Sequence, residues 1–215
     1  SDPLNVKEQN FTGSSTINFS VQTSELKNFV AFNNNFKTHV YNMGVVLNQN
    51  LHALPAQDMI IVSHPLFISQ AEQIADFHRN EGLRVVVVNP FQIYNEFSSG
   101  AQDIVAIRDF VRMFYERATN VDDLPKYLLL FGDGSYDNKD RLTDNTNFIP
   151  TYQSINSLSI TGSLVSDDYY GLLDSNEGKW AAGVEYVDVG IGRFPVKTIE
   201  EAENVVSKVL NYRKV

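Results

Sequence analysis

The sequence contains no cysteine among its 215 residues. Disulfide bonds, thiolate metal sites and a cysteine nucleophile supplied by this chain are therefore all excluded. Long apolar runs are also missing, because the longest, such as MIIV and YLLLF, span only four or five residues. A membrane-spanning helix needs about 20 apolar residues, so we expect no segment that crosses a bilayer.

Basic residues are few and nowhere clustered. The chain has 17 Lys and Arg against 26 Asp and Glu, which gives a formal net charge of −9. Nucleic-acid binding needs concentrated positive charge, so we expect no nucleic-acid partner. The surplus of carboxylates would suit a cation or a basic peptide, although it would equally serve a soluble surface.

The overall composition is that of a folded protein, with 43% apolar and 20% charged residues. The length suffices for one sizeable domain, or for one domain and a smaller piece. No secretion signal opens the chain, and a helical pattern continues into its last residues, NYRKV. We therefore expect a piece of a longer protein.

Residues 1–56 differ from the rest of the chain in their pattern of polar and apolar residues. TINFSVQ (16–22) alternates polar and apolar residues, as a half-buried strand does. Residues 27–47 carry aromatic and β-branched side chains around the turn-prone Asn33–Asn35. The pattern predicts two to four antiparallel strands, forming a small β-rich segment at the end of a preceding domain.

Residues 57–215 alternate buried strands with amphipathic helices. The predicted strands are DMIIVSHP (58–65), LRVVVVNP (83–90), KYLLLFGDG (126–134) and EYVDVGIGRFP (185–195). Three helices are predicted. The first follows a capping box of Ser69 and Glu72, the second spans residues 100–119, and the third follows a capping box of Thr198 and Glu201. This order predicts an α/β fold with three layers, in which helices flank a mainly parallel sheet.

Ligands of open α/β sheets gather at the carboxyl ends of the strands. The turn after the first strand, SHPLFIS, has no glycine, so we expect no dinucleotide site of the G-x-G-x-x-G type. The four histidines form no His-x-His pair, and only His64 ends a strand, which argues against a catalytic metal pair.

The stretch GDGSYDNKD (132–140) follows the third strand and is rich in side-chain oxygen. Asp133, Asp137, Asn138 and Asp140 could hold calcium, although their spacing is not that of an EF-hand. Alternatively, Gly132 and Asp133 build a tight turn in which the Asp side chain caps backbone amides. The residues alone leave both interpretations open.

The stretch VSDDYYGLLD (165–174) sets two adjacent acids in an apolar segment. In an extended chain Asp167 and Asp168 would point in opposite directions, so only one would face the strand-end cleft. A carboxylate there could orient a histidine imidazole or meet a cationic side chain of a substrate. The alternative is that both acids accept backbone hydrogen bonds in a loop.

Several separated motifs resemble the gingipain-type cysteine peptidases, family C25. They are LLLFGDGSYDNK, IPTYQS, VSDDYYGLLD and DVGIGRFPVKTIEEAENVVSKVLNY, in that order. NLHALPAQDMIIVSHPLFISQAEQ and FSSGAQD resemble, within this family, the sortases of type IX secretion. The resemblance covers residues 50–215.

The resemblance implies a caspase-like peptidase domain made of two α/β halves, of which residues 57–215 are the first. The nucleophilic Cys and its His partner would come from the second half, so this chain would be inactive alone. Asp167 matches the family's carboxylate beside the active site and would be a supporting catalytic residue. Asp168, Tyr169 and Asp133 would bind substrate or support the pocket nearby. Asp168 departs from gingipains, which carry an uncharged residue there, so their preference for Arg or Lys is not transferred.

By the same resemblance the full-length parent would remove C-terminal sorting domains from exported cargo and would meet other secretion-system components. It would lie at the cell surface, on the outer membrane or in the periplasm. No cofactor is required, and calcium is possible. The alternative is a non-catalytic binding module that keeps the peptidase scaffold and docks cargo or secretion partners.

Overall fold

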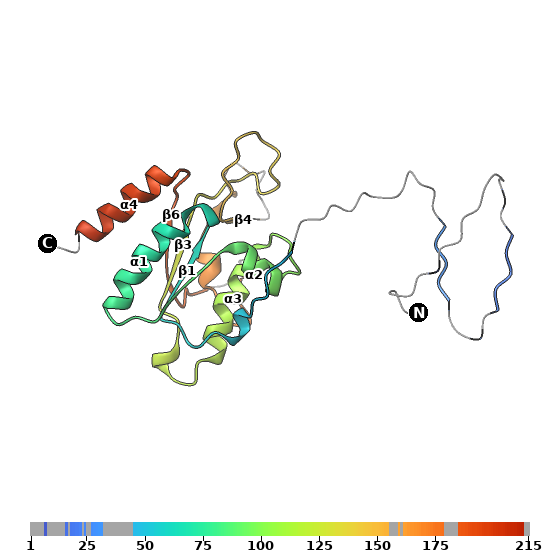
Figure 1. Ribbon diagram of the computed structural model, residues 1–215, viewed down its shortest axis with the longest axis horizontal. Coiled ribbons are helices and arrows are strands. Elements are labelled where there is room, and N and C mark those ends of the chain that lie inside the picture. The colour runs from blue at the N-terminus through green and yellow to red at the C-terminus, as the bar shows by residue number, and fades with distance from the viewer. Residues whose placement is uncertain are drawn as a thin grey trace. The chain divides into compact units, whose positions relative to one another are not determined.

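Figure 1 shows a computed structural model of the chain, which divides into two compact units, Ser1–Leu47 and Asn48–Val215. The structure describes residues 45–154, 159, 161–178 and 185–212, and in the first unit also residues 7, 16, 18–22, 24 and 27–31. Those residues of the first unit are exposed and form neither helix nor strand. The predicted strand at 16–22 is therefore absent from the residues described there, and most of the other predicted strand positions lie outside the described residues.

The second unit is built on a parallel sheet. Its strands are β1 (Met59–Ser63), β2 (Val85–Val88), β3 (Tyr127–Phe131) and β6 (Gly190–Phe194), in the order β2-β1-β3-β6. Each of the pairs β1–β2, β1–β3 and β3–β6 is parallel. The prediction of a mainly parallel sheet is confirmed.

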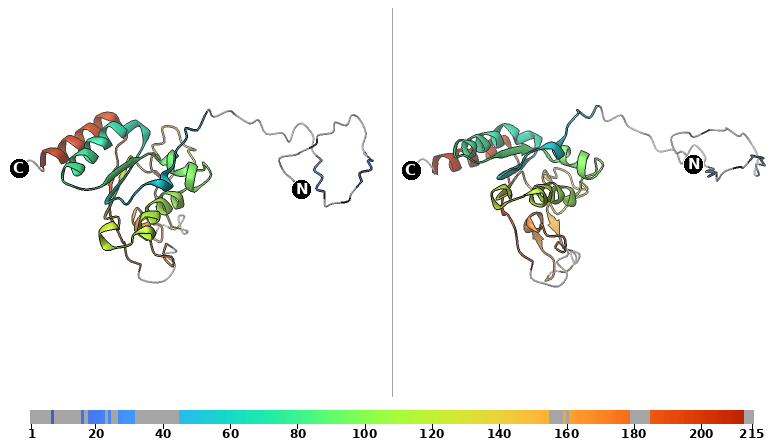
Figure 2. Two further views of the ribbon diagram at one scale, coloured as in Figure 1. Left: turned by 60° about the horizontal axis from the view of Figure 1, so that its bottom comes forward. Right: turned by 90° about the horizontal axis from the view of Figure 1, so that it is seen from below.

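Helices cover both faces of this sheet, as Figure 2 shows. The first face carries α1 (Ile68–Asn80) and α4 (Ile199–Tyr212), and the second carries α2 (Pro90–Phe97) and α3 (Ile104–Arg117). The three predicted layers are thus confirmed. Among the described residues no helix is long and apolar enough to cross a membrane.

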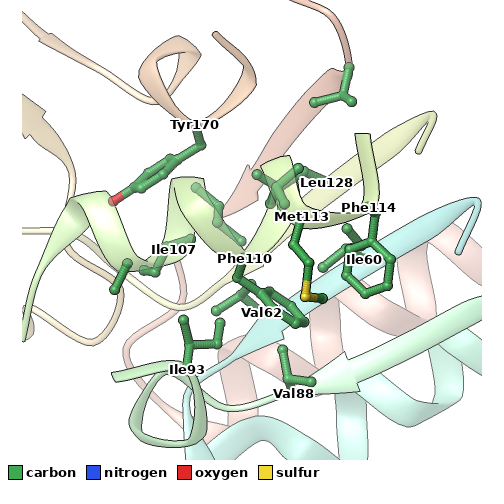
Figure 3. Close-up of a cluster of buried hydrophobic side chains, with 14 of the residues drawn as sticks. Ile60, Val62, Val88, Ile93, Ile107, Phe110, Met113, Phe114, Leu128 and Tyr170 are labelled. Atoms are coloured by element: carbon green, nitrogen blue, oxygen red, sulfur yellow. The ribbon is translucent and has the colours of Figure 1, made fainter. Parts of the chain in front are cut away.

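Alternate residues of each strand feed two separate cores. Ile60, Val62 and Leu128 point toward α3, where Phe110 and Tyr170 are fully buried (Figure 3). Met59, Ile61 and Leu129 point the other way, against α1 and α4. Because both faces of the central strands are buried, their sequences are continuous apolar runs instead of alternating ones.

Three local predictions need correction. The helix expected from a Ser69 cap starts at Ile68, directly after a 3₁₀ turn (Pro65–Phe67) whose first residue is a proline, so Ser69 lies inside it. The strand expected over 185–195 is confined to Gly190–Phe194. Sequence analysis missed α2, although Asn89 and Gln92 form a capping box there and Pro90 occupies its first turn.

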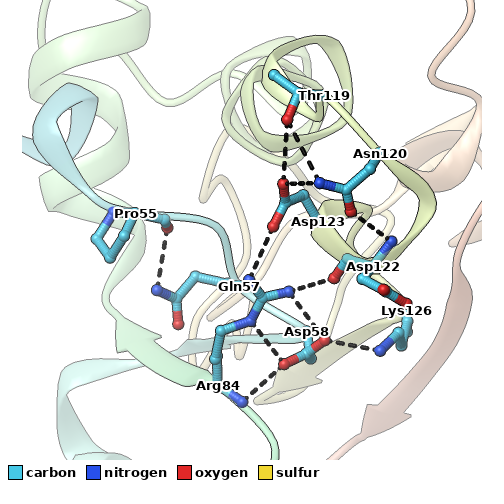
Figure 4. Close-up of polar contacts among 9 residues, drawn as sticks. All are labelled: Pro55, Gln57, Asp58, Arg84, Thr119, Asn120, Asp122, Asp123 and Lys126. Carbon is cyan, nitrogen blue, oxygen red and sulfur yellow. Dashed lines mark hydrogen bonds and ion pairs between the residues drawn. The ribbon is translucent and has the colours of Figure 1, made fainter.

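Charged side chains fasten the amino-terminal end of the sheet, as Figure 4 shows. Asp58 is buried and accepts hydrogen bonds from the Arg84 guanidinium and from Lys126. The hydrogen bonds from Arg84, and then that from Lys126, outweigh the burial of Asp58 and hold the pKa of its carboxyl well below its ordinary value. The three residues lie next to β1, β2 and β3, so the cluster pins these strands together.

Candidate functional site

The carboxyl-terminal edge of the sheet has its topological switch point between β1 and β3, where a crevice is expected. In this chain, aromatic side chains pack at this position. The ring of Phe148 stacks on His64, with 4.2 Å between centroids, and meets the buried Phe67 edge-on. Gly132, at φ +147°, permits this approach, since a Cβ there would lie 3.1 Å from the Cβ of Phe148.

His64 has a structural place at this edge. Its Nδ1 accepts the Leu66 N–H at 3.4 Å and so caps the 3₁₀ turn that leads into α1. Burial lowers the pKa of the imidazole, because the charged form loses its hydration. His64 is therefore a stacked cap whose burial favours the neutral imidazole.

Asp133, at the start of the loop that follows β3, binds Thr146 near the end of that loop. Its carboxylate accepts the Thr146 hydroxyl at 2.6 Å and lies 3.4 Å from the Lys197 ammonium. The predicted capping of backbone amides belongs to another residue: Asp137 accepts the N–H groups of Arg141 and Leu142 at 2.6 and 2.7 Å.

The carboxylates of the oxygen-rich loop do not converge on one point. Within the described part of the chain, no group of three or more His, Cys, Asp and Glu could hold a metal ion. The Asp137 carboxylate is turned toward the loop's own amides instead of outward. The calcium hypothesis thus finds no cluster of three carboxylates among the described residues.

Asp167 lies between strand β5 (Val165–Ser166), which pairs with β4 (Tyr152–Gln153), and a 3₁₀ turn (Asp168–Gly171) in which Asp168 is the first residue. Asp167 forms a bidentate ion pair with Arg193 of β6, with Nε–Oδ2 and Nη2–Oδ1 distances of 2.7 Å. Asp168 is exposed, and its amide donates to the Ser166 hydroxyl. The two acids thus diverge, one toward a cation and one toward solvent.

The tyrosines of the same stretch are core residues. Tyr169 is 5% exposed, stacks on Tyr152 at 4.9 Å between centroids and lies beneath the Arg108 guanidinium. Tyr170 is fully buried and donates its hydroxyl to the Pro150 carbonyl. The two tyrosines therefore anchor the stretch in the core, while Asp167 is half-buried and Asp168 is exposed.

Arg193 connects Asp167 to the turn that precedes Asp133. Its guanidinium also donates to the Gly132 carbonyl beside Asp133 and to the carbonyls of Ile149 and Pro150. Asp167 and the Asp133 turn therefore meet around one side chain at the ends of β3 and β6. Sequence analysis missed Arg193, because the residues around an arginine in a strand do not indicate which distant side chain it will pair with.

Comparisons with known proteins add a second line of observation. The model of peptidase family C25 matches residues 52–214. The crystal structure of dimeric latent PorU from Porphyromonas gingivalis is similar over 79% of this chain, with 39% identity and a TM-score of 0.69. The Arg-specific cysteine proteinase gingipain R is similar over 77% of it, with 22% identity and a TM-score of 0.50. No curated protein sequence matches the chain.

The match covers only a minor part of these larger proteins. The chain spans 17% of the PorU chain and 30% of the gingipain R chain. At 22% identity the likeness to gingipain R concerns the fold alone, whereas the family match extends over most of this chain.

Proposed function

Since the chain belongs to peptidase family C25, and so is a cysteine-peptidase-like domain, we propose that it is the N-terminal α/β half of a gingipain-like endopeptidase that acts as a sortase. The full-length parent would remove C-terminal sorting domains from cargo of type IX secretion, at the cell surface, on the outer membrane or in the periplasm. The observation that carries the proposal is the family match over 52–214, together with the 39% identity to PorU.

The chemistry divides between this chain and a completing half. A cysteine peptidase needs a thiolate that attacks the scissile carbonyl and a histidine that takes the proton. This chain has no cysteine, so the thiolate must come from residues outside it. Asp167 would supply a supporting carboxylate and Asp168 a substrate contact, with Asp133 and the buried Tyr169 as their support.

The strand order suggests where the completing half would lie. Strand β6 is at the edge of the sheet, and among the described residues it pairs only with β3. Gly190 and Gly192 of β6 are exposed, so the backbone there is accessible. A half placed along β6 would stand beside Arg193 and the carboxylate that it holds.

A cleavage assay tests the proposal. Purified full-length parent is incubated with a reporter that ends in a C-terminal sorting domain, with and without iodoacetamide, and the products are identified by mass spectrometry. We expect cleavage by the parent, none after alkylation and none by residues 1–215 alone. Cleavage that alkylation leaves intact would refute a thiolate mechanism.

Variants in the same assay test the site. Asp167→Asn should lower kcat by about tenfold or more, which corresponds to about 1.4 kcal/mol of transition-state free energy. Asp168→Asn should raise KM. Asp76→Asn, on the exposed face of α1 in a pair with Arg79, is the matched control and should change neither constant. Unchanged turnover in Asp167→Asn would remove its assigned role.

The alternative is a binding module without catalysis. The observation in its favour is that the Asp167 carboxylate is already paired with Arg193, as in a structural ion pair. A full-length parent that binds the reporter but never cleaves it would establish this alternative.

A further inference from the structure

Arg193 uses every N–H group of its guanidinium. Its side chain is 12% exposed and reaches from β6 under the turn at Gly132. Nε and Nη2 donate to the two oxygens of Asp167, Nη1 donates to the carbonyls of Gly132 and Ile149 at 2.9 and 2.8 Å, and Nη2 donates to that of Pro150 at 3.2 Å. Five donors in one plane leave the group no rotational freedom.

The Asp167 carboxylate, by contrast, has few other supports. Asp167 precedes the 3₁₀ turn at Asp168–Gly171, but its side chain makes no capping hydrogen bond there. Within the described residues, Arg193 is its recorded side-chain partner, and 24% of the Asp167 side chain remains exposed. The orientation of the carboxylate is therefore set from β6 and not by its own segment.

We propose that Arg193 is the positioning residue of this site: it fixes the Asp167 carboxylate at the open edge of the sheet and ties it to the loop from Gly132 to Pro150. This inference rests on the function proposed above. A lysine could supply the charge but not the bidentate geometry, because its ammonium is a point donor without the planar fork.

The pairing also determines what Asp167 can still do. A carboxylate has about four acceptor positions, of which a bidentate arginine occupies two. Its charge is balanced by Arg193, so Asp167 is a poor partner for a cationic substrate side chain. The free acceptor positions suit an N–H group, such as that of an imidazole from the completing half.

A double-mutant cycle in the full-length parent tests the inference. kcat and KM for the sorting-domain reporter are measured for Asp167→Asn, Arg193→Gln and the double variant, with thermal unfolding of each. If Arg193 acts through Asp167, each single variant lowers kcat by about tenfold or more, and the double variant is no worse than Asp167→Asn within about twofold. Independent effects would multiply instead.

Arg108 provides a matched control. Like Arg193, it donates to three carbonyls, those of Leu172, Asp174 and Glu177, but it is buried and pairs with no carboxylate among the described residues. Arg108→Gln should lower the unfolding temperature, and any effect that it has on kcat should multiply with that of Asp167→Asn. Arg193→Lys, which keeps the charge, should fold but keep most of the kcat defect.

The outcomes separate the two proposals. If Asp167→Asn lowers kcat while Arg193→Gln is fully active, the positioning role of Arg193 is overturned and the role of Asp167 stands. The same follows if the kcat losses of the two single variants multiply in the double variant. An Asp167→Asn variant with normal turnover overturns the role of Asp167 and the inference with it. If Arg193→Gln does not fold, full activity of Arg193→Lys is the result that overturns the inference.

Discussion

The buried Arg108 and the half-buried Arg193 hold the segment from residue 167 to residue 178, which follows β5. Arg193 binds its beginning at Asp167, and Arg108 binds the carbonyls of Leu172, Asp174 and Glu177 farther along. Buried carbonyls outside helices and strands need donors, and a guanidinium can serve several at once. The segment is thus ordered by side chains instead of by a backbone ladder.

Glycine at position 132 is required by the backbone of the same site. Its φ of +147° is a conformation that other residues rarely adopt, and a Cβ would press on Phe148. We expect Gly132→Ala to lower the free energy of unfolding by about 1–3 kcal/mol, measured by urea denaturation. Gly192→Ala is the matched control, since nothing lies within 4 Å of a Cβ there, and should cause no loss. Equal stability of both variants would contradict this account.

At the scale of elements, residues 49–52 are fastened to α2 by one carboxylate. Glu96 accepts the Leu51 N–H at 2.7 Å and is bound by the side chains of Gln49 and His52. Burial opposes ionisation, but these hydrogen bonds prevail and lower the pKa of Glu96 from 4.5 to about 2. The segment before β1 is therefore part of the α/β unit.

The stability from Glu96 should depend on pH in a defined window. Because the folded pKa is lowered, the contribution is complete above pH 4.5 and is lost as the pH falls toward 2. Glu96→Gln should cost about 2 kcal/mol at pH 7 and flatten the profile in this window. Glu116→Gln, which breaks an exposed pair with Arg112, should change stability by less than about 0.5 kcal/mol. A wild-type profile that stays level between pH 4.5 and 2 would refute the assignment.

The elements that sequence analysis predicted correctly have a strong hydrophobic pattern. The strands β1, β2 and β3 are continuous apolar runs, and α3 has a broad apolar stripe, so their own side chains specify them. The missed helix α2 has only eight residues and depends on its Asn89 cap. The start of α1 was misplaced because the turn at Pro65 merges with the helix.

The site was predictable only in part for a similar reason. Asp167 belongs to a motif that resembles a known family, whereas its partner Arg193 lies 26 residues away on another strand. Only strand pairing brings the two together, and no local pattern encodes a specific long-range contact. The same holds for His64 and Phe148, whose stacking closes the crevice between β1 and β3.

At the scale of the whole molecule, both recorded cores draw their residues from Leu51 onward. One lies between the sheet and α2 with α3, the other between the sheet and α1 with α4. The unit Asn48–Val215 therefore contains the hydrophobic burial that stabilises the α/β fold.

We expect a chain that begins at Asn48 to unfold within about 2 °C of the full chain in a thermal melt. A chain that begins at Asp58 should unfold at a lower temperature, because it lacks the buried Leu51 and the donors to Glu96. A large loss on removal of residues 1–47 would show that the α/β unit depends on them.

The contacts of Arg193 have a consequence for the order in which the protein folds. They close loops of 26 residues to Asp167, 44 to Ile149 and 61 to Gly132. Loop closure over such separations costs entropy before any contact forms, and long-range parallel pairing is slow. Strands β1 and β2 can pair after a single crossover through α1. The Asp167 carboxylate, however, cannot bind Arg193 in its final position until β6 has paired with β3. We therefore expect the pairing of β6 with β3 and the placement of the Asp167 carboxylate to form in the same step of folding.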